Sequence, residues 1–157
     1  MDFLLTEEQL MLKDMVSKFA QEKIAPVASE NEKKHKYPEE IIKELGELGI
    51  MGISYPTEYG GAGMDFMSYF LAVEEISRWC ASTGVIVSAH SSLVCDPIFR
   101  FGTEEQKQKY LPGLLSGQTI GSFSLTEAGA GSDAGATKTT AKLEGDKWVL
   151  NGSKLFA

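Results

Sequence analysis

The chain changes its hydrophobic period within Gly117-Gln118-Thr119-Ile120-Gly121-Ser122-Phe123-Ser124-Leu125-Thr126, and this stretch decides the fold class. Before it, apolar residues recur every three or four positions, as in helices that bury one face. Within it, Phe123 and Leu125 alternate with hydroxyl-bearing residues, which is the spacing of a strand with one polar face. The sequence therefore predicts an α+β fold, with an all-helical domain over residues 1–116 and the first strands of an antiparallel β-domain over residues 117–157.

Capping signals and prolines divide the predicted helical domain. Thr6 and Gln9 match a capping box at the start of a first helix, which Pro26 is expected to interrupt. Pro38 suits the first turn of a second helix, and Gly49 suits its end. Three stripes are expected to be buried: Leu12, Met15, Val16, Phe19 and Ala20; Ile41, Ile42, Leu45 and Leu48; and Phe66, Tyr69, Phe70, Val73 and Ile76.

The remaining helices are expected over residues 65–79 and 82–101 and from Thr103 onward, with Pro112 and Gly117 bounding a last short one. Between residues 55 and 63 the glycines indicate a loop, because glycine permits positive φ and close backbone approach.

The β-domain is expected to continue after a glycine-rich loop. Residues 137–144 alternate again, Gly145-Asp146 and Asn151-Gly152 match two-residue hairpin turns, and strands are expected at 147–150 and from Ser153 to Ala157. A sheet of three or four short strands has an open edge and little core of its own. The pattern therefore predicts that the β-domain is truncated at Ala157.

Composition narrows the class of protein. The hydrophobic fraction of 43% and the charged fraction of 24% are typical of a soluble globular chain. The net charge of −7 disfavours nonspecific binding to nucleic acid or to an anionic membrane, and no apolar run reaches the roughly 18 residues of a membrane span. Two cysteines, Cys80 and Cys95, do not make a disulfide framework, so a cytoplasmic setting is expected. No cluster has metal-ligand spacing.

The run most informative about chemistry is Phe123-Ser124-Leu125-Thr126-Glu127-Ala128-Gly129-Ala130-Gly131-Ser132-Asp133. Successive backbone N–H groups in such a glycine-rich loop can surround an anion or bond a planar heterocycle. A Rossmann phosphate loop does not fit, because the glycine spacing differs and a strand pattern rather than a helix follows. A Walker loop lacks its Gly-Lys-Ser/Thr. An ordinary polar turn is the plain alternative.

The order of residues in this run resembles the flavin-contacting signature of the acyl-CoA dehydrogenase family, through Leu125-Thr126-Glu127-x-x-Ala130-Gly131-Ser132-Asp133. The resemblance covers the whole chain and is greatest to short-chain, butyryl-type members. Its other motifs are Met1 to Gln9, Glu58-Tyr59-Gly60-Gly61-x-Gly63, Phe101-Gly102-Thr103-Glu104-Glu105-Gln106-Lys107, Asn151-Gly152-Ser153-Lys154 and, for the butyryl type, Ser88-Ala89-His90-Ser91-Ser92-Leu93.

The resemblance implies an FAD enzyme built from a helical domain, a middle β-domain and a C-terminal helical bundle, usually as a homotetramer. In the family, a glutamate of the C-terminal domain removes the α-proton of an acyl-CoA, the β-hydrogen leaves as hydride to the flavin, and an electron-transferring flavoprotein takes the electrons. This chain has no counterpart of that base, so we expect it to be inactive alone. Glu127 is not expected to replace the base, because that position serves the loop.

The resemblance also assigns site residues. The flavin contacts it implies are Phe123, Ser124, Leu125, Thr126, Gly131, Ser132 and Phe156, and the acyl-CoA contacts are Ser132, Ser88 and Ser92. Two other functions stay open. The chain could be a non-catalytic binding or assembly module on the same scaffold, which would associate with a partner without flavin. It could also belong to a family variant with oxidase or monooxygenase chemistry.

Overall fold

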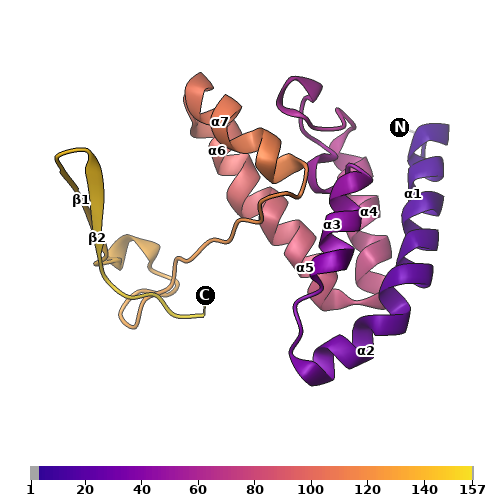
Figure 1. Ribbon diagram of the computed structural model, residues 1–157, viewed down its shortest axis with the longest axis horizontal. Coiled ribbons are helices and arrows are strands. Elements are labelled where there is room, and N and C mark those ends of the chain that lie inside the picture. The colour runs from indigo at the N-terminus through magenta and orange to yellow at the C-terminus, as the bar shows by residue number, and fades with distance from the viewer. Residues whose placement is uncertain (1–3, 157) are drawn as a thin grey trace. The chain divides into compact units, whose positions relative to one another are not determined.

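The computed structural model describes residues 4–156, which divide after Gly121 into two compact units (Figure 1). The first unit is helical. The second contains one antiparallel pair of strands. The α+β class predicted from the sequence is therefore confirmed, whereas the domain boundary at residue 117 stays a prediction.

Seven α-helices form the described part of the helical unit, joined in two places by π-helical turns at Ala20–Ile24 and His90–Cys95. Their bounds are α1 Glu7–Phe19, α2 Ala25–Lys34, α3 Glu39–Glu47, α4 Phe66–Trp79, α5 Ala81–Ala89, α6 Asp96–Phe101 and α7 Glu104–Leu115.

The first helix begins as its capping signal predicts. The Gln9 N–H donates to the Thr6 hydroxyl at 3.2 Å, and the Thr6 N–H donates to the Gln9 side chain at 3.0 Å. The expected interruption at Pro26 is confirmed, because α1 ends at Phe19 and a separate helix, α2, begins at Ala25. A π turn carries the chain from α1 into α2, and Pro26 lies in the first turn of α2, where its missing N–H does little harm.

The expected break at Pro112 is wrong, because α7 runs through it to Leu115. The neighbouring side chains Leu111, Leu114 and Leu115 are all buried, and this packing holds the turn in spite of the lost backbone hydrogen bond. The helix then ends before Gly117, which has φ 73°.

The core of the helical unit forms two clusters, and the larger one lies between α1, α3, α4 and α5. The predicted stripes are buried in part. Met15, Leu48, Phe66 and Phe70 are instead exposed. Leu48 follows the last residue of α3 and has left the helical stripe. The members of the larger cluster are Leu12, Val16, Ala20, Ile24, Ile41, Ile42, Leu45, Ile50, Met51, Ile53, Tyr69, Ala72, Ile76 and Val87.

The loop between residues 55 and 63 depends on a glycine at position 61. A Cβ there would lie 2.1 Å from the Tyr55 carbonyl oxygen, so no other residue fits without moving the backbone. The close approach lets Gly63 N–H donate to that same carbonyl at 2.8 Å. The loop thereby fixes Tyr55 and Tyr59 in the smaller core cluster with Cys95, Leu111, Leu114 and Leu115.

The second unit has the predicted hairpin but fewer strands than expected. β1 (Thr140–Glu144) pairs with β2 (Lys147–Asn151), and Gly145 in the turn has φ 65°, as the Gly145-Asp146 signal predicts. The expected strands at residues 122–126 and from Ser153 are absent from the described residues, and Asn151-Gly152 makes no hairpin turn. Ala157 lies outside the described residues.

No helix within residues 4–156 combines the length and the apolar character that crossing a membrane would require.

Candidate functional site

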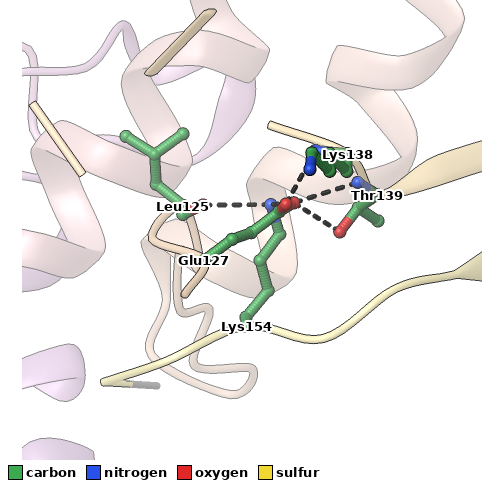
Figure 2. A network of polar contacts seen from close by, with 5 residues as sticks. All are labelled: Leu125, Glu127, Lys138, Thr139 and Lys154. Carbon is green, nitrogen blue, oxygen red and sulfur yellow. Dashed lines mark hydrogen bonds and ion pairs between the residues drawn. The ribbon is translucent and has the colours of Figure 1, made fainter. Parts of the chain in front are cut away.

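A network of polar contacts centred on Glu127 organises the second unit (Figure 2). Its carboxylate accepts hydrogen bonds from Lys138 N–H at 2.7 Å and from Thr139 N–H at 3.0 Å. The Thr139 hydroxyl donates to the same carboxylate at 2.6 Å, and Lys154 Nζ donates at 2.8 Å. One side chain therefore connects the start of the glycine-rich loop, the chain entering β1 and the chain leaving β2.

These contacts fix the charge of Glu127. Its side chain is 9% exposed, and the hydrogen bond from Lys154, followed by those from Thr139 and Lys138, holds the pKa of the carboxyl well below its usual range. A carboxylate that already accepts from four donors, and that is ionised far below neutral pH, is a weak proton acceptor. The geometry gives Glu127 a structural role in the loop, while its exclusion from catalysis stays a prediction.

The segment from Ser122 to Thr126 presents both apolar side chains and free donors. Phe123 is 52% exposed and Leu125 is 41% exposed. The Leu125 carbonyl accepts from Lys154 Nζ at 3.0 Å, and the Thr126 carbonyl accepts from Leu155 N–H at 2.8 Å. Among the described residues, the N–H groups of Leu125 and Thr126 and the Thr126 hydroxyl have no partner. They remain available to an external acceptor.

The loop after Glu127 is closed by a pair of backbone hydrogen bonds. Glu127 N–H donates to the Ala130 carbonyl at 3.0 Å, and Ala130 N–H donates back at 3.1 Å. Gly129 and Gly131 have negative φ, and a Cβ on either would meet no atom within 4 Å. The chain's own conformation therefore does not require these glycines. What they provide is open space beside exposed Ser132.

Phe156 lies one residue beyond the Leu155 N–H that bonds to Thr126. The residue is 94% exposed, and its backbone has φ 59°. The structure thus places the segment containing Phe156 beside the segment containing Leu125 and Thr126, although the two lie about 30 residues apart in sequence.

Ser88 and Ser92 belong to the helical unit. Ser92, in the π turn, donates to the Ser88 carbonyl at 2.7 Å, and the Tyr69 hydroxyl donates to Ser88 Oγ at 3.2 Å. Tyr69 stands in an aromatic group with Phe66 and Phe70, whose ring centroids lie 5.2 to 5.5 Å apart. Sequence reasoning missed this group as a neighbour of Ser88, because its helical spacing indicates an ordinary buried stripe.

The nearby histidine of the same motif is not accessible to a ligand. His90 is 0% exposed, and both of its ring nitrogens have partners within the helical unit.

The second unit therefore has the features that a planar heterocycle with a polar edge needs. Exposed Phe123 and Leu125 offer apolar contact, the free groups of Leu125 and Thr126 offer donors, and Gly131 leaves room. The described residues contain no group of three or more histidine, cysteine, aspartate or glutamate side chains placed to bind a metal ion.

Comparison with known proteins points to one family. The family model described as "Acyl-CoA dehydrogenase, N-terminal domain" matches residues 6–118. The chain is 52% identical over 156 residues to a short-chain specific acyl-CoA dehydrogenase of Clostridium acetobutylicum. That alignment covers 99% of this chain and 41% of the relative. It is 49% identical over 152 residues to the mitochondrial short-chain specific acyl-CoA dehydrogenase of Bos taurus. That alignment covers 97% of this chain and 37% of the relative. The chain thus spans about 40% of the length of these relatives.

Solved structures agree. Butyryl-CoA dehydrogenase from Megasphaera elsdenii matches with a TM-score of 0.91 at 42% identity, over 98% of this chain and 41% of that one. A structure described for the electron transferring flavoprotein of Acidaminococcus fermentans matches with a TM-score of 0.94 at 52% identity. The match covers 98% of this chain and 40% of that one. An acyl-CoA dehydrogenase from Bacillus anthracis, complexed with FAD, matches with a TM-score of 0.90 at 38% identity. The match covers 96% of this chain and 26% of that one. On the family match and these relatives together, the chain belongs to the acyl-CoA dehydrogenase family.

Proposed function

We propose that this chain supplies one side of the flavin site of an FAD-dependent acyl-CoA dehydrogenase that oxidises a short-chain acyl-CoA to the 2-enoyl-CoA. The observation that carries the proposal is the segment from Phe123 to Thr126, with its exposed apolar side chains and its unpartnered donors. The FAD complex of the Bacillus anthracis relative and the short-chain relatives support the cofactor and the substrate class.

In this proposal the flavin ring lies against Phe123 and Leu125. The Leu125 and Thr126 N–H groups, with the Thr126 hydroxyl, donate to its polar edge and make it a better electron acceptor. Ser124, between Phe123 and Leu125, also contacts the flavin, and Gly131 lets the glycine-rich loop come close to it. Phe156 covers the flavin ring on the side away from the substrate. FAD, when bound, supplies the hydride acceptor for the reaction.

The acyl-CoA contacts in this proposal are three serines. Ser132 contacts the CoA portion next to the flavin site. Ser88 and Ser92 line the acyl channel from the helical unit, with the Tyr69 hydroxyl holding Ser88 in place at 3.2 Å. The short-chain names of the relatives support a small acyl group.

Removal of the α-proton requires a base that this chain does not supply in our proposal. Its candidate carboxylate, Glu127, is 9% exposed and already accepts from Lys138, Thr139 and Lys154. We therefore expect the chain mixed with FAD to show no acyl-CoA-dependent reduction of an electron-accepting dye. A turnover rate that scales with the concentration of the chain would contradict this.

The partners proposed with this function are an electron-transferring flavoprotein, which accepts the electrons, and further copies of the same protein in a homotetramer. The match to the Acidaminococcus fermentans structure supports the first.

Titration of FAD with the chain, followed by flavin fluorescence, tests the proposed cofactor site. We expect a saturable change, and we expect Thr126→Val, which keeps the side-chain shape and removes the hydroxyl, to bind about five- to tenfold more weakly, as the loss of one hydrogen bond predicts. Ser153→Ala serves as the matched control, because Ser153 is exposed and its hydroxyl makes no hydrogen bond within the described residues. A linear, unsaturable response of the unmodified chain would overturn the proposal.

A further inference from the structure

Two segments proposed to contact the flavin lie side by side although neither belongs to a strand. One runs from Phe123 to Thr126 and the other leads from Lys154 to Phe156. A single backbone hydrogen bond joins them, from Leu155 N–H to the Thr126 carbonyl at 2.8 Å. In a sheet, a ladder of such bonds would fix the register of the two segments. Here one bond alone does not, so something else has to hold them in register.

The Lys154 side chain supplies the missing connections. Its Nζ donates to the Leu125 carbonyl at 3.0 Å and to the Glu127 carboxylate at 2.8 Å, on either side of Thr126 (Figure 2). With the backbone bond from Leu155, three successive residues, Leu125 to Glu127, are tied to two successive residues, Lys154 and Leu155. This arrangement leaves the N–H groups of Leu125 and Thr126 free among the described residues.

Glu127 in turn anchors the pair to the hairpin. It accepts from the backbone N–H groups of Lys138 and Thr139 just before β1. The chain after β2 passes close to the same point, since a Cβ on Gly152 would lie 2.2 Å from the Thr139 hydroxyl oxygen. The glycine therefore lets Lys154 reach Glu127 while Thr139 also bonds to it.

The pair differs from an ordinary surface salt bridge, which contributes little because water screens it and both side chains lose freedom. The side chains of Glu127 and Lys154 are 9% and 24% exposed, and each makes further hydrogen bonds to the backbone of other segments. Such a pair fixes the relative positions of the backbone segments that it joins, in addition to the attraction between its two charges.

We propose that Glu127 and Lys154 are positioning residues for the flavin site: by clamping Leu125–Glu127 to Lys154–Leu155, they set the spacing between the flavin-edge donors and the ring of Phe156. This inference rests on the proposed function. It assigns the two charged side chains no contact with the flavin itself.

The test compares the FAD affinity of five variants of the chain with that of the unmodified chain. Lys154→Met removes both bonds of the ammonium but leaves Glu127 with its three other donors, so the loop stays anchored. Glu127→Gln weakens the other half of the pair. Lys142→Met and Glu144→Gln are matched controls, because each removes the same charge from exposed β1. Amide chemical shifts of β1 and β2 report whether the hairpin is intact, and the shift of Leu155 N–H reports its bond to Thr126.

We expect Lys154→Met and Glu127→Gln to lower FAD affinity about tenfold, the loss typical of a hydrogen bond to a charged group, while the hairpin shifts stay unchanged. The two controls and the conservative Lys154→Arg should bind within about threefold of the unmodified chain, because arginine keeps the charge and the donors.

Three results would overturn the inference. Unchanged FAD affinity in Lys154→Met, with a shifted Leu155 N–H, would mean that the clamp exists but does not shape the site. An equal loss in Lys142→Met would mean that only net charge matters. Failure of the unmodified chain to bind FAD would instead overturn the proposed function, and this inference with it, so the two failures are distinguishable.

Discussion

The Gly121 N–H donates a hydrogen bond to His90 Nδ1 at 3.1 Å, so a buried histidine holds the last residue of the helical unit. Because Nδ1 accepts, the proton of the neutral ring is on Nε2, which donates to the Leu114 carbonyl at 3.0 Å. Cys95 Sγ lies 3.5 Å from Nε2, and burial raises the pKa of that thiol to about 12, so it stays neutral. The ring thereby joins the π turn, α7 and the exit of the chain.

Acidification should destabilise the helical unit through His90. Burial lowers the pKa of His90 below its ordinary value of 6.5. The unfolded chain then binds this proton at a higher pH than the folded chain, so the histidine's contribution to the free energy of unfolding is complete above about pH 6.5 and falls as the pH drops from there toward the lowered pKa.

Urea unfolding of the helical unit at several pH values between 7.5 and 5 measures this loss. His90→Asn, which keeps an acceptor for Gly121, should lack this part of the pH dependence and should also be less stable by about 1–3 kcal/mol at neutral pH. His35→Asn is the control, because His35 is exposed and has the left-handed backbone that asparagine tolerates. Equal pH dependence in the two variants would contradict the prediction.

A buried carboxylate in the helical unit should depend on its cations. Glu75 is 1% exposed and accepts no hydrogen bond from the described residues, while Lys13 Nζ and Arg78 Nη2 each lie 3.6 Å from its Oε1. Lys13→Met should therefore lower the free energy of unfolding by roughly 1–3 kcal/mol, because it leaves a buried charge less compensated. In a Glu75→Gln background the same change should cost far less.

A double-mutant cycle in urea measures this coupling. Lys23→Met is the matched control, since Lys23 pairs at 3.0 Å with Glu44 where both side chains are more than a third exposed. Its cost should stay below about 1 kcal/mol. A cost for Lys13→Met that is the same with Glu75 and with Gln at that position would show that the lysine acts by packing alone.

Two glycines of the loop should respond differently to a methyl group. A Cβ on Gly129 or Gly131 meets no atom within 4 Å, so neither Gly129→Ala nor Gly131→Ala should change the circular dichroism or the midpoint of unfolding. FAD affinity should fall only in Gly131→Ala, because only that position is proposed to lie against the flavin. Affinity that falls equally in both, or in neither, would count against Gly131 as a contact.

The sequence predicted the fold best where a single local signal was sufficient. Capping by Thr6 with Gln9 and the turn at Gly145 were both confirmed, because each depends only on residues close in the chain. Pro112 was misjudged, since the packing of the neighbouring leucines overcame the tendency of proline to end a helix.

In the candidate site, too, the sequence predicted local features but not contacts between residues far apart in the chain. The alternation of Phe123 and Leu125 predicted a strand, which the described residues do not contain, and it did not predict that a lysine side chain would take the place of a strand neighbour. Lys154 and Glu127 lie 27 residues apart, and no local pattern brings them together. The aromatic group beside Ser88 was hidden because exposed and buried faces of a helix have the same period.

The amide spectrum of the isotopically labelled chain during addition of FAD tests the central claim most directly, because it detects weak binding and locates it. We expect saturable shifts at Leu125, Thr126, Ser132 and Phe156, with the amides of α1 unaffected. Shifts that never saturate, or that fall in the helical unit and spare Leu125 and Thr126, would contradict the claim that this segment forms one side of a flavin site.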